Sequence, residues 1–261
     1  MKKTLIIVAV LLLTVSNFRA AAQAHNTYNN HNNQNHHSKR SKRSWGQGKN
    51  TDELNRPVSC MEFNNKYGKY SAIFINEDSR DITLTFDQGY ENGYTDKILD
   101  ILSEKDVRAI FFVTYGYVKK NAGLIKRMID DGHVIGNHSY RHKSMPALGE
   151  KAQEEEILFL HRYIKENFDY NMNLFRSPMG EFSEQSLAVA QGLGYSTVFW
   201  SFAYLDYEVE RQPAPSAALN TLIHAAHPGA IYLLHTASKT NADILAQMID
   251  GIRAEGFEFD V

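Results

Sequence analysis

From Asp81 onward the sequence alternates short apolar segments with longer amphipathic ones, and this alternation constrains the fold more than any other feature. Short apolar runs bounded by turn residues are typical of buried strands, whereas apolar residues spaced three and four positions apart are typical of helices. Strands that alternate with helices predict an α/β fold with a parallel sheet under helical cover. About seven such strands favour a closed or nearly closed barrel over two separate domains.

The expected elements follow one another in regular order. The expected strands span residues 81–86, 109–113, 133–137, 171–175, 196–200, 230–234 and 257–261. The expected helices span residues 95–105, 121–131, 151–167, 183–193, 215–225 and 241–255. Three of these helices end at a glycine, namely Gly132, Gly194 and Gly256, as helices commonly do.

The size and composition of the chain exclude little, but they set a frame. Its 261 residues can bury one substantial core, so one domain with extensions is the natural expectation. A formal net charge of -2 gives no reason to expect nucleic acid as a partner. Cys60 is the only cysteine, which excludes an intramolecular disulfide; this agrees with export without arguing for it.

The N-terminus has the pattern of a secretory signal. Lys2 and Lys3 precede an apolar run over residues 5–15, and Ala22-Gln23-Ala24 offers a small-x-small cleavage site. The apolar run is shorter than the ~20 residues that a membrane span needs. We therefore expect a signal peptide over residues 1–24, cleavage near Ala24, and a secreted mature chain without a stable membrane span.

A low-complexity, disordered tether is expected over residues 25–65, because its first half is rich in Asn, His, Gln and Ser and has little to bury. Its histidines can bind stray metal, but compositional drift explains them more simply. The basic run over residues 39–43 fits an anionic wall or membrane surface, and it fits a solvated linker equally well.

An N-terminal arm is expected over residues 66–80, before the main domain over residues 81–261. Trp45-Gly46 and the apolar run over residues 72–75 indicate a segment that packs on this domain. The sequence assigns no chemistry to the arm.

Polar residues that can do chemistry stand where the expected strands end. In chain order from the first strand to the sixth, they are Asp87, His138, His142, Arg176, Asp206 and His235. In a parallel α/β barrel the working face lies at the C-terminal ends of the strands. We therefore expect these side chains to gather at one mouth of the barrel.

Each of these residues also has a structural interpretation. Asp87 precedes a turn at Asn92-Gly93, so it either caps the next element or acts as a base. Arg176 either forms a structural ion pair or keeps a catalytic carboxylate ionised, and the two are compatible. His235 follows an apolar strand and is either a hydrogen-bonded core residue or a general acid; its expected place opposite Asp87 favours the acid.

Two further features concern a metal ion and an anion. His138 and His142 are four residues apart, which places both imidazoles on one side of a helical turn and suits a divalent metal. Such a pair alone is weak evidence for a metal site. The evidence is stronger here because the pair is expected at the same end of the barrel as Asp87. The segment Arg176-Ser177-Pro178-Met179-Gly180 forms a stiff turn that can point backbone amides inward.

Together these segments resemble the NodB-type polysaccharide deacetylases, carbohydrate esterase family 4, over roughly residues 81–261. Five motifs stand in the family's order: Thr85-Phe86-Asp87-Gln88-Gly89, His138-Ser139-x-x-His142, Arg176-x-Pro178-x-Gly180, the Asp206-Tyr207 region and Leu233-Leu234-His235. More narrowly, residues 86–95, 198–201 and 227–236, with the Trp45-Gly46 lead-in, are similar to the muramic δ-lactam-forming de-N-acetylases of spore cortex peptidoglycan.

The resemblance implies a distorted (β/α) barrel, the NodB homology domain, that hydrolyses the N-acetyl group of N-acetylmuramic acid in peptidoglycan. In that reaction Asp87 would take a proton from water, and His235 would protonate the departing amine. Arg176 would keep Asp87 ionised, and Asp206 would pair with Arg176 and tune His235. A backbone amide near Met179 would help to hold the oxyanion.

The resemblance also implies a divalent metal cation, Zn²⁺ or similar, on His138 and His142. Most of the family has a second aspartate, a metal ligand, where this chain has Gln88. A neutral amide is a poorer ligand, so weaker metal binding is expected; the δ-lactam subgroup also lacks this acid. Tyr207 stands where many relatives have Trp, which keeps an aromatic wall beside the substrate.

Two other functions remain open. One is the same hydrolysis on N-acetylglucosamine in peptidoglycan or chitin oligomers. The other is a wall-binding protein that has lost catalysis, for which Gln88 is the only support. In each case the partner is a glycan strand in the cell wall or spore cortex, outside the membrane.

Overall fold

The computed structural model describes residues 39–261, and residues 42–261 form one compact unit. Its core is an eight-stranded sheet with the strand order β2-β8-β6-β5-β4-β3-β10-β9, in which each neighbouring pair is parallel. The signal peptide expected over residues 1–24 and the first part of the expected tether lie outside the described residues.

The elements have the following bounds. The strands of the main sheet are β2 (Ala72–Ile73), β3 (Thr83–Gln88), β4 (Ile110–Val113), β5 (Val134–Asn137), β6 (Leu174–Phe175), β8 (Ser196–Val198), β9 (Phe202–Ala203) and β10 (Ile231–His235). A separate antiparallel pair joins β1 (Arg43–Ser44) to β7 (Glu181–Phe182). The helices are α2 (Val58–Tyr67), α3 (Thr95–Glu104), α4 (Tyr115–Lys120), α5 (Ala122–Asp130), α6 (Glu150–Phe168), α7 (Glu184–Gly192), α8 (Pro215–His224) and α9 (Lys239–Ala254). Three short 3₁₀ helices are η1 (Gly68–Tyr70), η2 (Met145–Ala147) and η3 (Pro178–Gly180).

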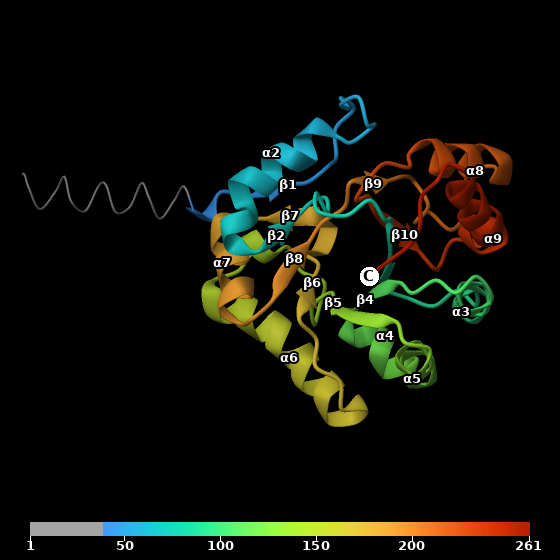
Figure 1. Ribbon diagram of the computed structural model, residues 1–261. Coiled ribbons are helices and arrows are strands. Elements are labelled where there is room, and N and C mark those ends of the chain that lie inside the picture. Colours follow the sequence, from blue (N-terminus) through green and yellow to red (C-terminus); the bar gives the residue numbers. More distant parts are fainter. Residues whose placement is uncertain (1–38) are drawn as a thin grey trace, which may run out of the picture. The chain divides into compact units, whose positions relative to one another are not determined.

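The sheet curls into an open barrel with helices around its outer side, and α3, α5, α6 and α9 are seen there in Figure 1. Since β2 and β9 end the strand order, the ring is not closed by hydrogen bonds among the described residues. This confirms the distorted (β/α) barrel, with eight strands where about seven were expected.

The two faces of each strand explain the apolar pattern. On β3, Leu84 and Phe86 pack in the main core against the helices, whereas Thr85 and Asp87 point into the barrel and contact Arg176. All four residues of β4 are buried, since helices cover one face and the barrel interior the other.

A small inner cluster fills the barrel below its mouth. It consists of Ile110, Phe112, Val198 and Ile231, from three different strands. This apolar layer separates the polar residues at the mouth from the opposite end of the barrel.

Most expected helices lie within two residues of their observed bounds, but the last expected strand is wrong. Residues 257–261 make only an isolated bridge, in which Phe259 pairs with Ile82. The strands β2 and β9 were not expected as strands, because two residues are too short to show a period.

The N-terminal arm begins earlier than the sequence suggested. Residues 43–44 form β1 and residues 58–67 form α2, whereas β1 and all but the last two residues of α2 were expected to belong to a disordered tether. Trp45 and Cys60 are buried in an aromatic cluster with Phe74 and Phe199. Single apolar residues spaced widely in a polar segment give no local period, and only the rest of the domain supplies the surface that covers them.

Candidate active site

A pocket of about 900 Å³ opens at the C-terminal ends of the strands. Its polar lining includes Asp87, His138, His142 and His235. The remaining lining residues are Gly89, Tyr90, Thr114, Gly116, Tyr140, Arg141, Met179, Gly180, Trp200, Ala203, Tyr204, Tyr207, Leu233 and Ala237. The structure therefore brings together Asp87 and His235, which are 148 positions apart in the sequence and are register partners on adjacent strands.

Arg176 crosses the barrel interior to reach Asp87. It follows β6 directly, and its Nη1 donates to Asp87 Oδ1 at 2.9 Å and to Thr85 Oγ1 at 2.7 Å. Its guanidinium lies 4.1 Å from the centroid of the Phe112 ring, a cation–π distance. Gly136 makes room for that ring, because a Cβ atom there would lie 2.4 Å from it.

Asp87 is held as a carboxylate. Burial would raise its pKa, but the positive charge of Arg176 outweighs burial and lowers the pKa below its ordinary range. Its second oxygen, Oδ2, lies 3.5 Å from His138 Nε2 and accepts no hydrogen bond from Arg176. One oxygen is therefore anchored and the other is turned toward the two histidines.

The rings of His138 and His142 meet at the pocket, with 3.1 Å between their Nε2 atoms. His138 Nδ1 donates to the backbone carbonyl of Arg176 at 2.9 Å, which leaves its Nε2 with a lone pair. Burial lowers the pKa of His138 to about 4 and also lowers the pKa of His142. Both imidazoles are therefore held neutral, the form that binds metal.

The predicted helical turn between these histidines is wrong, although the rings do meet. Ser139 and His142 have φ angles of 72° and 54°, in the left-handed region. Side chains replace the helical hydrogen bonds: Asn137 Oδ1 accepts from Ser139 N at 2.8 Å, and Ser139 Oγ accepts from His142 N at 2.9 Å. A spacing of four residues is thus produced by a tight loop.

The two histidines fit a metal ion as a pair. Nitrogen atoms 3.1 Å apart are close enough for one cation to contact both, since a zinc–nitrogen bond is ~2.0–2.1 Å long. Among the described residues, no cluster of three or more His, Cys, Asp or Glu side chains has metal-binding geometry. The described protein atoms therefore offer two nitrogen ligands and no carboxylate-completed triad.

Gln88 points away from this pair. Its side chain is completely buried, and its Oε1 accepts from Thr236 Oγ1 at 2.5 Å. Its Nε2 has no hydrogen-bond partner among the described residues. Because side chains alternate along a strand, Gln88 and Asp87 at the end of β3 face opposite sides of the sheet.

His235 ends β10 and is the register partner of Asp87 on the adjacent β3. Asp206, which is buried, accepts from His235 Nδ1 at 2.8 Å through Oδ1 and from His235 N at 2.7 Å through Oδ2. Burial alone would lower the pKa of His235, but the Asp206 carboxylate raises it above its ordinary value. The Nε2–H of this ring is left for the pocket.

The expected pairing of Asp206 with Arg176 is wrong. Arg176 donates to Asp87, Thr85 and two backbone carbonyls, whereas Asp206 receives its hydrogen bonds from another part of the barrel. The two acid–base pairs share one pocket but are separate pairs.

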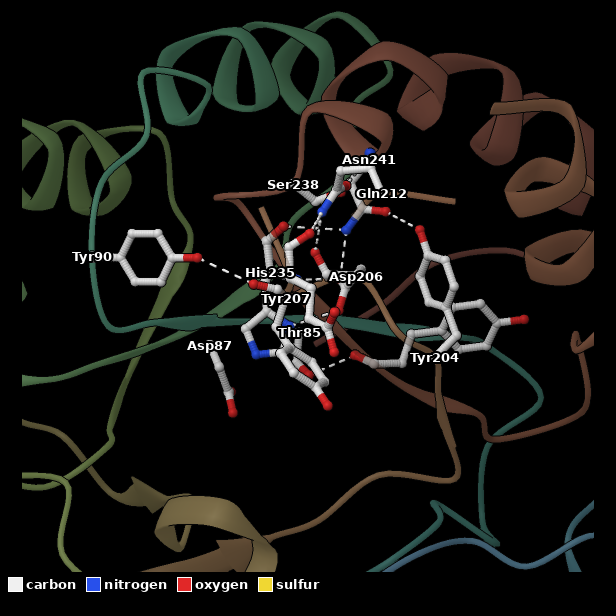
Figure 2. A network of polar contacts seen from close by, with 12 residues as sticks. Thr85, Asp87, Tyr90, Tyr204, Asp206, Tyr207, Gln212, His235, Ser238 and Asn241 are labelled. Carbon is white, nitrogen blue, oxygen red and sulfur yellow. Dashed lines mark hydrogen bonds and ion pairs between the residues drawn. The ribbon is translucent and has the colours of Figure 1, made fainter. Parts of the chain in front are cut away.

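Sequence reasoning missed Asn241, which completes the surroundings of Asp206. Its Nδ2 donates to Asp206 Oδ2 at 2.6 Å, and its Oδ1 accepts from the hydroxyl of Tyr204. Figure 2 shows Asp206 enclosed by Asn241, Gln212 and His235. The Ser238-x-x-Asn241 pattern signals a helix start, since Ser238 Oγ accepts from Asn241 N, but nothing local indicates that the amide reaches Asp206.

The turn after Arg176 has one backbone amide, that of Met179, which the hydrogen bonds of the turn do not use. Met179 lines the pocket and has a φ of 59°, and Gly180 has a φ of 64°. The hydrogen bonds of this turn run from Gly180 N to Ser177 O and from Glu181 N to Pro178 O, so neither uses the Met179 amide. This leaves the Met179 N–H as a donor for an anion.

Tyrosine side chains line the outer part of the pocket. Tyr207 is half exposed, its ring lies 5.9 Å from that of His235, and its carbonyl accepts from the hydroxyl of Tyr90 at 3.2 Å. Figure 2 shows this contact between the two loops. An aromatic surface beside a polar pocket suits a sugar ring, which has both apolar faces and hydroxyl edges.

Chemically, the pocket combines a carboxylate with a lowered pKa and an imidazole with a raised pKa on adjacent strands. Two neighbouring titratable groups whose pKa values are shifted in opposite directions are typical of a general base and a general acid. With two neutral histidines and a free amide close by, the site is suited to hydrolysis of an acyl bond.

Comparisons with known proteins agree with this geometry. The polysaccharide deacetylase family model matches residues 75–198. The chain is 39% identical over 218 residues to the peptidoglycan-N-acetylmuramic acid deacetylase PdaA of Bacillus subtilis, covering 83% of this chain and 82% of that protein. It is 30% identical over 185 residues to a peptidoglycan-N-acetylglucosamine deacetylase of Bacillus cereus, covering 68% of this chain and 84% of that protein.

The fold comparison points the same way. The solved structure of Bacillus subtilis PdaA, a family 4 carbohydrate esterase, superposes with a TM-score of 0.80 at 38% identity and covers 85% of this chain and 95% of that one. Identity at this level over most of both chains, together with the matching barrel, leads to one assignment. The chain belongs to the polysaccharide deacetylases of carbohydrate esterase family 4 and is a carbohydrate deacetylase.

Proposed function

We propose that this protein hydrolyses the N-acetyl group of N-acetylmuramic acid in peptidoglycan. The observation that carries the proposal is the pairing of Asp87 and His235 in register on β3 and β10, with pKa values shifted in opposite directions. The choice of sugar is supported by the 39% identity to a peptidoglycan-N-acetylmuramic acid deacetylase.

Asp87 acts as the base in this proposal. It removes a proton from the water that attacks the acetamide carbonyl, and its free Oδ2 is the oxygen that receives the proton. Arg176 anchors Oδ1 and keeps the group ionised before the reaction. Removing the proton from water leaves a hydroxide equivalent at the carbonyl carbon.

His235 then acts as the acid. Its Nε2–H transfers a proton to the departing amine when the carbon–nitrogen bond breaks, and Asp206 stabilises the imidazolium that holds this proton beforehand. The negative charge that develops on the carbonyl oxygen is accepted by the Met179 N–H. The products are acetate and a free amine on the sugar.

His138 and His142 would hold a divalent cation such as Zn²⁺, whose chemistry is the polarisation of the carbonyl oxygen. With two nitrogen ligands and Gln88 turned to the other side of the sheet, we expect the cation to bind more weakly than in a site with a carboxylate ligand. The geometry of the two rings supports this assignment.

We also propose that the protein acts outside the membrane, in the cell wall or spore cortex, where the freed amine can close a muramic δ-lactam during sporulation. The support is the substrate in the names of its relatives and the signal-like N-terminus in the sequence. From residue 39 to residue 261, no helix is both long enough and apolar enough to cross a bilayer.

The direct test is acetate release from peptide-stripped glycan by the purified, metal-loaded protein. We expect acetate, and mass spectrometry should place the free amine on the muramic ring. Absence of acetate from every metal-loaded sample would contradict the proposal. Asp87→Asn should abolish turnover and retain glycan binding, because the amide cannot accept the proton.

A second candidate is the same reaction on N-acetylglucosamine. The observation that favours it is the 30% identity to a Bacillus cereus peptidoglycan-N-acetylglucosamine deacetylase. A free amine located on the glucosamine ring would decide for this candidate. A non-catalytic wall-binding role has less support, because Asp87, Arg176 and His235 are present and in contact geometry with their partners.

A further inference from the structure

We propose that Arg141 forms a carboxylate-binding subsite that recognises the lactyl group of muramic acid and so sets the preference for this sugar. The inference rests on the proposed function and adds a residue that distinguishes its two candidate sugars. Neither the five motifs nor the acid–base geometry assigns a role to this side chain.

Arg141 lies in the reaction pocket and has the charge that the subsite needs. It lines the same pocket as Asp87, and it precedes His142 in the chain. Among the described residues that line this pocket, no other is a lysine or an arginine. A negatively charged substituent that enters beside Asp87 needs hydrogen-bond donors, and Arg141 is the lining side chain that can offer two of them from one guanidinium.

A buried acid fixes the inner side of the guanidinium. Glu156, on α6, has no exposed surface, and its two oxygens accept from Arg141 Nε at 2.7 Å and from Arg141 N at 2.7 Å. Neither terminal nitrogen of Arg141 donates a hydrogen bond to any residue in the described part of the chain. The side chain is 45% exposed. Glu156 therefore holds the guanidinium through Nε, with the Tyr140 ring centroid 5.0 Å from its Cζ atom, and the two Nη atoms keep their donors for a ligand.

The chemistry of the substrate matches this arrangement. N-acetylmuramic acid differs from N-acetylglucosamine by a lactyl ether on C3, next to the C2 atom that has the acetamide. When the acetamide lies at Asp87 and the histidines, the lactyl carboxylate must lie close to it in the same pocket. A guanidinium fork binds a carboxylate through two parallel hydrogen bonds, a geometry that a lysine cannot reproduce.

The expected difference in affinity between the free carboxylate and its ester depends on how far Glu156 neutralises Arg141. Glu156 already balances the charge of Arg141, so long-range attraction is small and the two hydrogen bonds carry the preference. Hydrogen bonds to a charged group in a half-exposed site predict about 10-fold tighter binding of the free carboxylate than of its ester.

The test measures binding in an Asp87→Asn background, so that no turnover is needed. The probes are a GlcNAc–MurNAc disaccharide with a free lactyl carboxyl and its methyl ester, titrated by calorimetry into the full chain. With Arg141 present, we expect the free acid to bind about 10-fold more tightly than the ester. With Arg141→Gln, the two should bind equally well, at the level of the ester.

Matched variants separate recognition from damage to the loop. Arg162→Gln removes an exposed arginine of α6 outside the pocket lining and should keep the 10-fold ratio. Arg141→Lys keeps the charge but not the fork, and should retain only part of the ratio. A ratio near one with Arg141 present, or an unchanged ratio in Arg141→Gln, would overturn the inference.

A turnover measurement repeats the comparison without the Asp87 substitution. The kcat/KM of the wild type for the free acid should exceed that for the ester by about 10-fold, and Arg141→Gln should lower only the former. Equal losses on both probes would count against recognition. If the wild type releases no acetate from either probe, the proposed function fails, and the binding ratio still decides the role of Arg141.

Discussion

At the scale of single residues, the site depends on two ionisable groups that lie side by side but prefer opposite charge states. Asp87 faces Arg176, a permanent cation, whereas His235 faces Asp206, a buried anion. Both groups are largely enclosed by the protein, and desolvation alone would make each one neutral. The partner of each group therefore determines its role.

This arrangement predicts the alkaline side of the pH profile. His235 must be protonated to act as the acid, and its pKa is raised, so activity should fall with rising pH only above the ordinary histidine pKa of about 6.5. In Asp206→Asn, the largest effect that opposes burial is lost and only the more distant Asp87 still raises the pKa, so the pKa of His235 falls. The alkaline limb of kcat/KM should then move below pH ~6.5, with a loss of about 100-fold at pH 8.

The control for this shift is Asp250→Asn, which removes an exposed carboxylate and should leave the profile unchanged. Acetate release measured across the pH range gives both limbs. The acid limb is not diagnostic, because protonation of His138 and His142 would also release a cation bound to them. An alkaline limb that stays in place in Asp206→Asn would refute the assignment of His235.

Asn241 supports Asp206 from behind and should affect both stability and rate. In Asn241→Ala the buried Oδ2 atom loses one donor, so the free energy of unfolding should fall by about 1–3 kcal/mol. The freed carboxylate should also orient His235 less well, which lowers kcat. Urea unfolding and acetate release measure the two effects, and Asn220→Ala on the exposed side of α8 is the control. Unaltered kcat would show that His235 alone positions Asp206.

At the scale of elements, the N-terminal arm supports the turn that presents Met179. Strand β1 pairs with β7, and Trp45 N donates to Gly180 O at 2.9 Å. The indole of Trp45 donates to the carbonyl of Trp200 at 2.9 Å, and Trp200 lines the pocket. A segment that the sequence assigned to a tether therefore packs directly behind the site.

Trp45→Ala should reveal this coupling. Loss of a buried indole in an aromatic cluster should lower the free energy of unfolding by about 3–5 kcal/mol. It should also lower kcat at temperatures where the protein remains folded, because the turn at Met179 is less well held. Trp45→Phe keeps most of the packing but removes the indole hydrogen bond to the Trp200 carbonyl, so it measures the contribution of that hydrogen bond. A variant that is destabilised but has a normal kcat would show that the arm does not influence catalysis through the turn at Met179.

At the scale of the whole molecule, one side chain ties the barrel together across its interior. Arg176 extends from the end of β6 to Asp87 and Thr85 on β3. It also donates to the carbonyls of Val198, the last residue of β8, and of Phe199, which follows it. The apolar layer at Phe112 lies beneath it. The residue that keeps the proposed base, Asp87, ionised also links distant strands.

Arg176→Met should therefore be strongly destabilising. It leaves Asp87 buried without a counter-ion, which should lower the free energy of unfolding by about 3–5 kcal/mol. The double variant Asp87→Asn/Arg176→Met removes the unpaired charge and should recover part of this loss. Urea unfolding of the wild type, both single variants and the double variant gives the coupling energy. Additive losses would show that the ion pair contributes nothing beyond its separate side chains.

The alternating pattern of the sequence determined the parallel barrel. Buried strands and amphipathic helices can each be recognised from the spacing of apolar residues within a short segment. The polar residues at the strand ends followed from the same logic, since parallel strands place all their C-terminal ends at one edge. The structure alone decided which groups pair: Asp206 with His235 and Asn241, Arg176 with Asp87, and Gln88 on the opposite side of the sheet. Such pairings depend on contacts between distant segments, which no local period encodes. The N-terminal arm was predicted to be a tether for the same reason, because the residues that bury Trp45 and Cys60 come from distant parts of the sequence.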